Sequence, residues 1–285
     1  MLMANHLIYN NDTMNKLFDL KDRVIVLTGA TGVLGTSISR YFGTQGAKVV
    51  LLVRERSFEK GEAIATEIRE AGGEALCVVA DVMNKESLES ACAQILDRYS
   101  RVDVLMNAAG GNMPAATVAP DKTIFDLDTE AVKTVSDLNL FGTVIPTMVF
   151  AKVMVKQGSG SIINFASESA LRPLTRVAGY GVAKAAVVNW TKYLCAEVAM
   201  KFGEGIRVNA IAPGFILTNQ NRSLLTNPDG TLTARGNTIV AHTPIGRFLE
   251  PEELFGTLHW LASDASKAVT GTVAVVDGGF DAFSI

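Results

Sequence analysis

The chain has 285 residues, of which 48% are hydrophobic and 19% charged, a composition typical of a globular protein and not of a disordered one. Its formal net charge of −3 provides no basic surface for nucleic acid or an anionic membrane. Cys77, Cys92 and Cys195 lie too far apart for a CxxC pair or a zinc site. We therefore expect reduced thiols and no metal site.

Residues 1–13 are polar and poorly patterned, and they lack the basic start and apolar run of a signal peptide. We expect them to form an extension ahead of the fold. We also expect no apolar run long enough to span a membrane, and hence a cytoplasmic protein. Residues 14–285 show neither a linker-like change of composition nor an internal repeat, which predicts a single domain.

Short β-branched runs alternate with helical segments from residue 23 onward. We expect strands at 24–27, 48–53, 75–80, 102–106, 161–165, 206–211 and 272–276. Helices are expected from the first glycine turn to about residue 45, at 58–71, 86–99 and 129–155, around 180–198, and from Pro251 onward. The strands are continuously apolar, as in parallel sheets covered on both faces. This pattern predicts an α/β fold, with one doubly wound (Rossmann) parallel sheet of seven strands and helices on both faces.

Two segments interrupt this alternation. Residues 108–127 open with Gly110-Gly111-Asn112-Met113-Pro114 and are longer than most connections in such folds, which makes them a candidate binding loop. Residues 213–245 are rich in Thr, Asn and Gly and show little pattern. We interpret the second segment as a mobile substrate lid.

A glycine-rich turn, residues 28–35 (TGATGVLG), connects the first strand to the first helix. Glycines at this junction let the backbone approach a pyrophosphate and point helix N-terminal amides at it. A plain packing turn is the alternative, but the position favours nucleotide binding by residues that include Gly29, Thr31, Gly32, Val33 and Leu34.

The end of the second strand bears on the choice of cofactor. Folds that select NAD usually place an acid here, whereas Val53 and Arg54 occupy this place. Arg54 suits a 2′-phosphate and favours NADP(H) slightly over NAD(H). Alternatively, Arg54 pairs with Glu55 or is merely solvated.

Tyr180 and Lys184 stand four residues apart in a segment with helical periodicity, so their side chains share a helix face. A nearby cation favours the phenolate form of a tyrosine. Lowering a phenol pKa by about three units takes roughly 4 kcal/mol of differential stabilisation, and the product is a general acid/base for an alcohol or ketone. An ordinary helix face is the more common explanation of such a pair taken alone.

Together, these pieces resemble the classical short-chain dehydrogenase/reductase family over about residues 17–281. The matching positions are the glycine turn, Asp81-Val82, Asn107-Ala108-Ala109-Gly110, Asn139, Ser167, Tyr180 with Lys184, and Pro213-Gly214 followed by Thr218. The resemblance implies an oxidoreductase that moves a hydride between a nicotinamide cofactor and a secondary alcohol or ketone.

The resemblance also implies roles for individual residues. Tyr180 would be the acid/base, Lys184 would lower its pKa and bind the nicotinamide ribose, and Ser167 would bind the substrate oxygen. Asn139 would hold a water in a proton relay behind Lys184. The cofactor would further contact Asp81 and Val82 at the adenine, Asn107, Ala108, Ala109 and Gly110 along its path, and Pro213, Gly214, Ile216 and Thr218 at the nicotinamide.

The turn departs from the family pattern TGxxxGxG, because Val33 occupies the place of the middle glycine and Gly32 precedes it. We expect the close approach to the pyrophosphate to come from Gly32, or the loop to shift.

Within the family, several stretches look like the sugar-acid reductases, a group with fructuronate reductases (D-mannonate oxidoreductases) that is close to the gluconate 5-dehydrogenases. These stretches are Gly32-Val-Leu-Gly35, residues 107–114, residues 125–128, residues 139–146 and residues 276–280. A polyhydroxy acid needs polar and cationic partners. The candidates are Asn112, Ser169 and Arg176, with Asn219, Gln220 or Arg222 from the lid. A surface ion pair is the ordinary role of any one arginine.

Other functions stay open at this level. The chain could reduce a β-ketoacyl thioester or a steroid-like ketone, although the polar residues 218–222 fit these less well, or it could be a gluconate 5-dehydrogenase. A non-catalytic nucleotide sensor or scaffold on the same fold is a further alternative. The resemblance implies a homotetramer, formed through the helices after the fourth and fifth strands.

Overall fold

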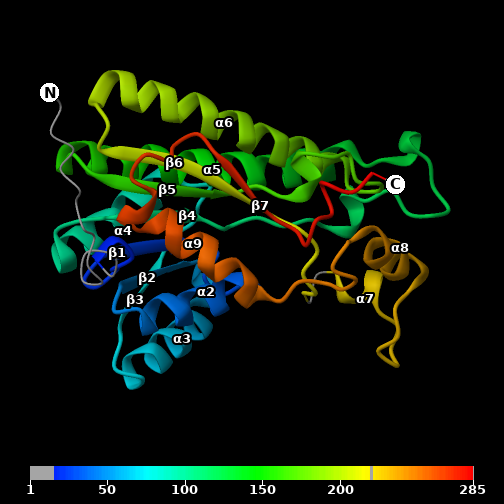
Figure 1. The fold of residues 1–285 in the computed structure, drawn as a ribbon, viewed down its shortest axis with the longest axis horizontal. Coiled ribbons are helices and arrows are strands. Elements are labelled where there is room, and N and C mark those ends of the chain that lie inside the picture. Colours follow the sequence, from blue (N-terminus) through cyan, green and yellow to red (C-terminus); the bar gives the residue numbers. More distant parts are fainter. Residues whose placement is uncertain (1–15, 219–220, 285) are drawn as a thin grey trace, which may run out of the picture.

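The computed structural model describes residues 16–218 and 221–284, so the expected extension at 1–13 and the lid positions Asn219 and Gln220 lie outside the described residues. Seven parallel strands form one sheet in the order β3-β2-β1-β4-β5-β6-β7 (Figure 1). They are β1 Val24–Thr28, β2 Lys48–Val53, β3 Glu74–Val79, β4 Val104–Asn107, β5 Gly160–Phe165, β6 Ile206–Pro213 and β7 Val273–Val276. The prediction of a doubly wound parallel sheet is confirmed.

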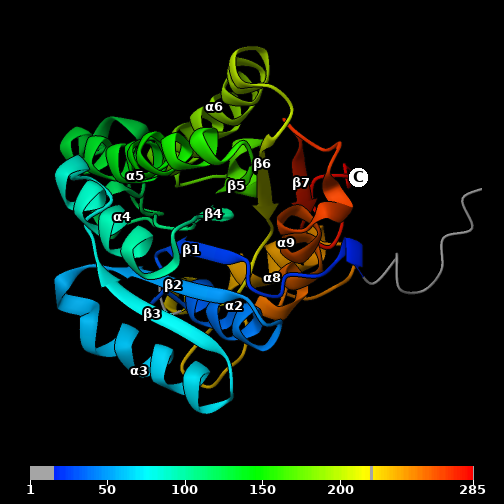
Figure 2. The same cartoon turned by 90° about the vertical axis from the view of Figure 1, so that its left-hand side faces the viewer.

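Helices cover both faces of this sheet (Figure 2). On one face lie α2 Val33–Thr44, α3 Phe58–Glu70 and α9 Phe255–Ala262. On the other lie α4 Lys85–Tyr99, α5 Thr129–Gln157 and α6 Ala178–Phe202. Two shorter helices, α7 Arg222–Leu225 and α8 Ala234–His242, belong to the segment between β6 and β7.

Alternation along the strands divides the interior into two cores. In β1, Ile25 and Leu27 pack with α2, α3 and α9, whereas Val24 and Val26 pack with α4, α5 and α6. Successive residues of a strand point to opposite faces. A strand that is apolar at every position is therefore buried on both faces, as the sequence pattern predicts.

The fourth strand begins two residues later than the sequence pattern predicts. The backbone N–H of Val102 donates to the side-chain oxygen of Gln157 at 2.8 Å, and the Gln157 amide donates back to the Val102 carbonyl at 2.8 Å. Both main-chain groups of Val102 are therefore satisfied by a side chain from the end of α5, and the ladder with β1 starts at Val104.

Helix α5 corrects the expectation that no segment approaches the length of a membrane span. Among the described helices, α5 alone is long and apolar enough for one. It nevertheless packs against the sheet, where Val149, Phe150 and Met154 enter the same core as α4 and α6. Part of its apolar character therefore belongs to the interior of the fold.

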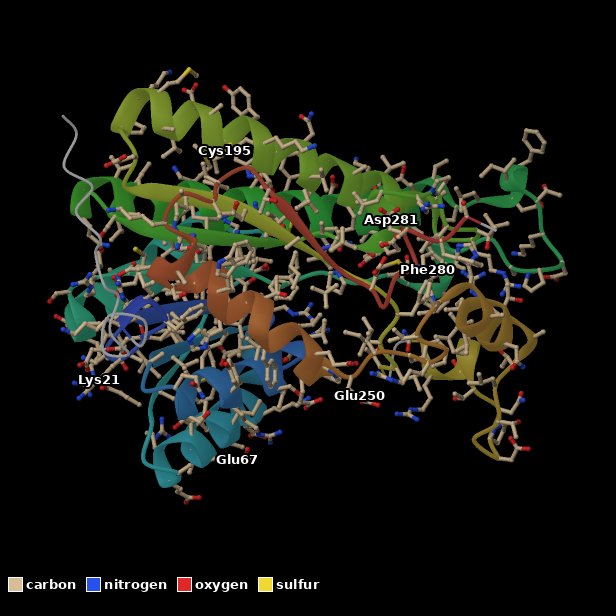
Figure 3. The ribbon with its side chains drawn as sticks, in the orientation of Figure 1. Lys21, Glu67, Cys195, Glu250, Phe280 and Asp281 are labelled. Carbon is tan, nitrogen blue, oxygen red and sulfur yellow. The ribbon has the colours of Figure 1, made fainter. Side chains whose placement is uncertain are left out.

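The segment 213–245 is more ordered than the sequence suggests. Leu225 of α7 and Ile239 of α8 are buried together with Phe280, and Phe215 and Phe248 pack against them. This small core ties the segment to the C-terminal stretch, where Phe280 and Asp281 lie (Figure 3). The few buried apolar residues of the segment are separated by many polar ones, so its sequence shows no helical or strand periodicity.

Candidate active site

Ser167, Tyr180 and Lys184 come together at the carboxyl end of β5. Ser167 follows that strand and accepts a hydrogen bond from the backbone N–H of Ser169 at 3.3 Å. Tyr180 lies in the first turn of α6, and the Lys184 Nζ lies 5.7 Å from the centre of its ring. Lys184 also donates to the carbonyl of Phe165, the last residue of β5, at 2.6 Å. This bond fixes the beginning of α6 against the strand.

Asn139 lies behind Lys184 and holds the loop that follows β4. Its side-chain amide donates to the Gly111 carbonyl at 2.7 Å and to the Val135 carbonyl at 2.8 Å. Its oxygen accepts from the Gly111 N–H at 3.1 Å. A Cβ at Gly110 would come within 2.5 Å of that oxygen and 3.4 Å of the Lys184 Nζ. The absence of a side chain at residue 110 therefore lets the asparagine and the lysine approach each other.

Burial is the main cause of the pKa shifts of both Tyr180 and Lys184. It raises the pKa of Tyr180, against a smaller lowering by the hydrogen bond with Ser167. It lowers the pKa of Lys184, which is 4% exposed, to about 8. The predicted lowering of the Tyr180 pKa is therefore wrong for this structure, because desolvation of the phenolate outweighs the stabilising contacts.

The glycine turn packs closely on the loop that follows β4. Gly29 has a left-handed φ of 68°, and a Cβ there would lie 2.8 Å from the Ala108 carbonyl. A Cβ at Gly35 would lie 2.2 Å from the Gly29 carbonyl. Gly32 caps α2 without a side-chain hydrogen bond, which leaves the first amides of the helix available to a ligand.

Val33 occupies the position of the middle glycine, but its side chain does not fill the space inside the turn. Its side chain is 37% exposed. At Gly32 a Cβ would meet a single close neighbour, the Gly29 carbonyl at 3.3 Å. The departure from the family pattern is thus accommodated by an outward side chain.

The residues expected at the adenosine end follow β2 and β3. Arg54 is exposed directly after β2, and Val82 is nearly buried after β3. Asp81 is exposed, and its carboxylate accepts from the Met83 N–H at 2.9 Å. The sheet order makes β2 and β3 neighbours, so all three lie at one edge region beside the glycine turn.

Asn107 has a different surrounding from the one expected. Its side chain is completely buried and donates to Thr147 Oγ1 and to Asn164 Oδ1, both at 2.9 Å. It therefore joins β4, β5 and α5. Ala108 and Gly110 lie along the path assigned to the cofactor, and the Ala109 N–H donates to Thr28 Oγ1 at 3.0 Å.

A cavity of about 530 Å³ unites the expected catalytic and substrate residues. Its lining includes Leu34, Ala108, Gly110, Asn112, Ser167, Ser169, Arg176, Tyr180, Lys184, Pro213, Gly214, Ile216 and Thr218. Asn139 is completely buried behind the cavity, and Arg222 is exposed outside its lining. The substrate candidates Asn112, Ser169 and Arg176 thus share one cavity with the catalytic candidates, whereas Arg222 does not.

Two charged residues of the lining have no counterpart in the sequence predictions. Glu168 follows Ser167 and is 1% exposed, and Arg235 comes from α8. Glu168 could have been suspected from its position beside Ser167. Arg235 gave no signal, because it stands 60 residues from its hydrogen-bond partner Thr175, in an unpatterned segment.

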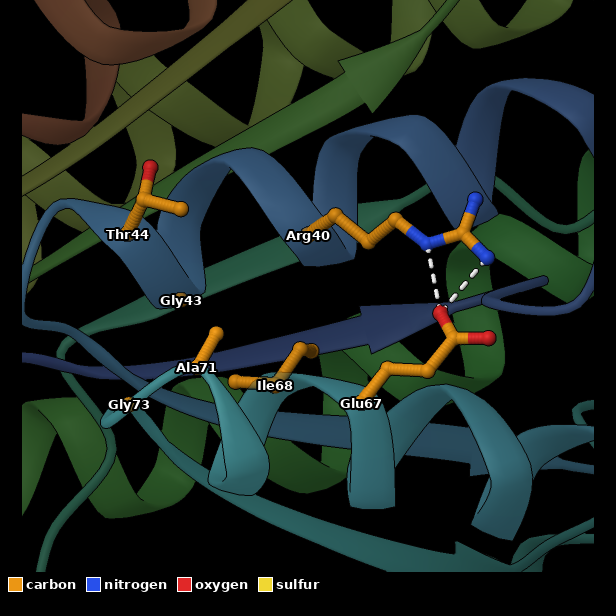
Figure 4. A pocket seen from close by; sticks show the side chains of 7 residues that line it. All are labelled: Arg40, Gly43, Thr44, Glu67, Ile68, Ala71 and Gly73. Atoms are coloured by element: carbon orange, nitrogen blue, oxygen red, sulfur yellow. Dashed lines mark hydrogen bonds and ion pairs between the residues drawn. The ribbon is translucent and has the colours of Figure 1, made fainter.

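A second hollow, of about 200 Å³, lies between α2 and α3 (Figure 4). Arg40 and Glu67 form an ion pair across it with an N–O distance of 2.6 Å, and both side chains are about half exposed. Such solvated pairs are ordinary surface features. In the described part of the chain no cluster of three His, Cys, Asp or Glu side chains suits a metal ion.

Comparison with known proteins identifies the family of the chain and several relatives. The family model described as enoyl-(acyl carrier protein) reductase matches residues 29–281. An uncharacterised oxidoreductase, UxuB of Bacillus subtilis, is 44% identical, and the alignment covers 93% of this chain and 97% of the relative.

Two solved structures are also similar. One is described as a candidate D-mannonate oxidoreductase from Haemophilus influenzae with bound NAD. It is 40% identical with a TM-score of 0.86, covering 93% of this chain and 97% of its own. The other, a gluconate 5-dehydrogenase from Burkholderia cenocepacia in complex with NADP and tartrate, is 29% identical with a TM-score of 0.84, covering 94% and 99%.

Proposed function

Because the chain belongs to the short-chain dehydrogenase/reductase family, we propose that Tyr180 serves as the acid/base of its oxidoreductase reaction. The substrate in this proposal is the secondary alcohol or ketone of a sugar acid of the fructuronate/mannonate type. The observation that carries it is the convergence of Ser167, Tyr180 and Lys184 in one cavity with Arg176.

The proposed mechanism assigns one task to each catalytic side chain. When bound, the nicotinamide supplies or accepts the hydride. In the reductive direction the Tyr180 hydroxyl donates a proton to the carbonyl oxygen while Ser167 Oγ donates a hydrogen bond to the same atom. Burial raises the pKa of Tyr180, which keeps the phenol protonated and ready to act as an acid.

Lys184 acts electrostatically on the same proton. With its pKa near 8, most of the ammonium is charged at neutral pH, and this charge stabilises the phenolate formed as Tyr180 releases its proton. Asn139 positions the loop at residues 110–111 beside Lys184. In the proposal it also holds the water that returns a proton to the site.

The residues present fit a dinucleotide. Uncapped amides at the start of α2 suit a pyrophosphate, and the close packing of Gly29 against Ala108 keeps side chains out of the path. Exposed Arg54 supports a slight preference for NADP(H), since a guanidinium pairs well with a 2′-phosphate.

The sugar-acid assignment rests on polar groups at the substrate end. Buried atoms of Asn112 (Oδ1) and Ser169 (Oγ) have no hydrogen-bond partner in the described structure. Unpartnered buried polar atoms are costly unless a ligand satisfies them, and the hydroxyl groups of a sugar acid would do so. The similarity to a candidate mannonate oxidoreductase and to a gluconate dehydrogenase supports the same class.

Reduction of a β-ketoacyl thioester is the second candidate, favoured by similarity to a 3-oxoacyl-(acyl carrier protein) reductase from Synechocystis, which is 35% identical over 93% of this chain. Nicotinamide absorbance assays of the purified protein distinguish the two. They would use fructuronate, 5-ketogluconate, the corresponding alcohols and acetoacetyl thioesters, each with NAD(H) and NADP(H). We expect turnover with the keto sugar acids and a higher kcat/KM with NADPH. Turnover with the thioesters alone would reject the sugar-acid proposal, and a clear preference for NADH would reject the role of Arg54.

The proposal also includes the oligomeric state and the cellular compartment of the protein. Residues 14–285 act as one domain with a lid at about 213–245, and its three free thiols suit the reducing cytoplasm. Exposed apolar side chains on the outer sides of α5 and α6, such as Phe141, Met148 and Met200, suit pairing with further copies as a homotetramer. A monomer in sedimentation experiments would contradict the assembly.

A further inference from the structure

Arg235 reaches the substrate cavity from the lid. Its guanidinium donates through Nη1 to Thr175 Oγ1 at 2.9 Å and through Nη2 to the Thr175 carbonyl at 3.1 Å. Thr175 precedes Arg176, which lines the same cavity. The two hydrogen bonds therefore hold the guanidinium of α8 next to the loop that connects Ser167 to Tyr180.

The two arginines repel each other, and no acid in the described part of the chain pairs with either of them. Burial lowers the pKa of Arg235, and the charge of Arg176 lowers it further. Among the described residues neither guanidinium forms an ion pair with a carboxylate. Fully buried cations are normally paired; these two guanidinium groups are only partly buried, and an anion placed between them would relieve their repulsion.

The remaining charges of the cavity add to this excess. Of the residues that the structure describes, the lining holds one further cation, Lys184, and one carboxyl group, Glu168. The Glu168 pKa is raised to about 7, first by burial and then by Asp277, so at neutral pH this carboxyl group carries only part of its charge. The cavity therefore favours an anion.

Arg176 is held in a conformation that a non-glycine residue adopts at a cost. Its φ is 76°, in the left-handed region that disfavours a residue with a Cβ. The Val118 N–H donates to its carbonyl at 3.1 Å and thereby fixes the backbone from the opposite loop. Strain of this kind tends to persist where function requires it.

We propose that Arg235 and Arg176 together bind the carboxylate of the substrate, with Arg235 as the residue that selects acids over neutral sugars. This inference rests on the proposed function, whose substrate class it makes specific. Arg235 belongs to α8 of the lid and contacts the loop between Ser167 and Tyr180. Binding of the carboxylate would therefore also hold α8 against the cavity. Asn112 and Ser169 then serve the neighbouring hydroxyl groups.

The test compares fructuronate with fructose, which has the same carbon chain but no carboxylate. Replacing a charged hydrogen-bond donor costs about 1.5–3 kcal/mol, or roughly 10- to 150-fold. We expect Arg235→Ala to lower kcat/KM for fructuronate by this factor, mainly through KM, and to change kcat/KM for fructose less than threefold. Arg176→Ala should behave alike, and Arg222→Ala, on the exposed side of the lid, should match the parent enzyme.

A binding measurement makes the result independent of turnover. Calorimetric titration with mannonate and with mannitol should show that Arg235→Ala loses affinity for the acid alone. Arg235→Lys keeps a cation but loses the two-pronged contact with Thr175 and should give an intermediate loss.

Equal losses for acid and neutral sugar in both Arg235 variants would overturn the proposal and leave a structural role. Unchanged affinity for mannonate would overturn it as well. A parent enzyme inactive with every sugar acid would instead reject the proposed function itself.

Discussion

At the scale of one residue, Glu168 links the candidate active site electrostatically to Asp277 and Asp281 of the C-terminal segment. Its carboxyl group is 1% exposed, and neither oxygen has a hydrogen-bond partner among the described residues. Its pKa is raised to about 7, first by burial and then by the carboxylates of Asp277 and Asp281, while Arg172 acts in the opposite direction. Arg172 itself pairs with Asp281 at 2.8 Å. A neutral Glu168 is therefore the form that this environment stabilises.

Because Glu168 is neutral in this environment, we predict that the free energy of unfolding falls as the pH rises. The pKa of Glu168 is raised in the folded state from an ordinary value of 4.5, so the folded protein holds the proton more tightly than the unfolded chain. Its contribution is fully present below about pH 4.5 and is lost as the pH rises to 7. The shift corresponds to about 3 kcal/mol.

Glu168→Gln keeps the neutral shape and should remove this component. Urea unfolding between pH 5 and 8, a range chosen to bracket roughly the titration of this group, should show a flatter stability profile for the variant, which becomes more stable than the parent at the upper end. Exposed Glu70→Gln serves as the control and should keep the parent profile. A Glu168→Gln profile parallel to the parent would show that Glu168 is ionised throughout.

The turn between β1 and α2 determines, at the scale of an element, whether a dinucleotide can bind. Gly35 lies in the first turn of α2, where a Cβ would meet the Gly29 carbonyl at 2.2 Å and the Ala30 Cα at 2.8 Å. Both neighbours are backbone, so the helix would have to move away from the turn. Gly256 in α9 has no atom within 4 Å of the same position.

These two glycines form a matched pair of helix substitutions. Alanine is favoured over glycine in a helix by about 1 kcal/mol, so Gly256→Ala should be neutral or stabilising. Gly35→Ala should destabilise the fold by roughly 1–3 kcal/mol through overpacking and weaken NADPH binding, measured by quenching of tryptophan fluorescence. Equal stability and equal NADPH affinity in the two variants would contradict the packing seen at the turn.

The sequence predicted the elements well where a local pattern encodes them. The apolar runs of β1, β2 and β5 and the helices between them need no distant partner to be recognised, and the Tyr180–Lys184 spacing indicates a shared helix face. The start of β4 was missed because it depends on Gln157, 55 residues away. The order of the lid was missed because its core includes Phe280, which lies far along the chain.

At the scale of the whole molecule, the candidate site is assembled at the carboxyl ends of the strands from loops and from the helices α5, α6 and α8. The resemblance to a family supplied Ser167 and Asn139, whose spacing alone does not reveal their proximity to Lys184. The repulsion between Arg176 and Arg235, and the raised pKa of Tyr180, arise from burial and contact in three dimensions. A local sequence pattern does not encode burial or contacts between distant residues. Arg235 and Glu168 were therefore recognised as part of the site only from the structure.

The proposed mechanism depends on a phenol, Tyr180, that transfers a proton to or from the oxygen of the carbon at which the hydride moves. The most direct test measures single-turnover oxidation of NADPH by Tyr180→Phe with fructuronate, with Tyr193→Phe on the exposed side of α6 as the control. We predict a fall in rate of roughly 10²–10⁴-fold for Tyr180→Phe with NADPH affinity unchanged, and the parent rate for Tyr193→Phe. A Tyr180→Phe variant that oxidises NADPH at close to the parent rate would contradict the account.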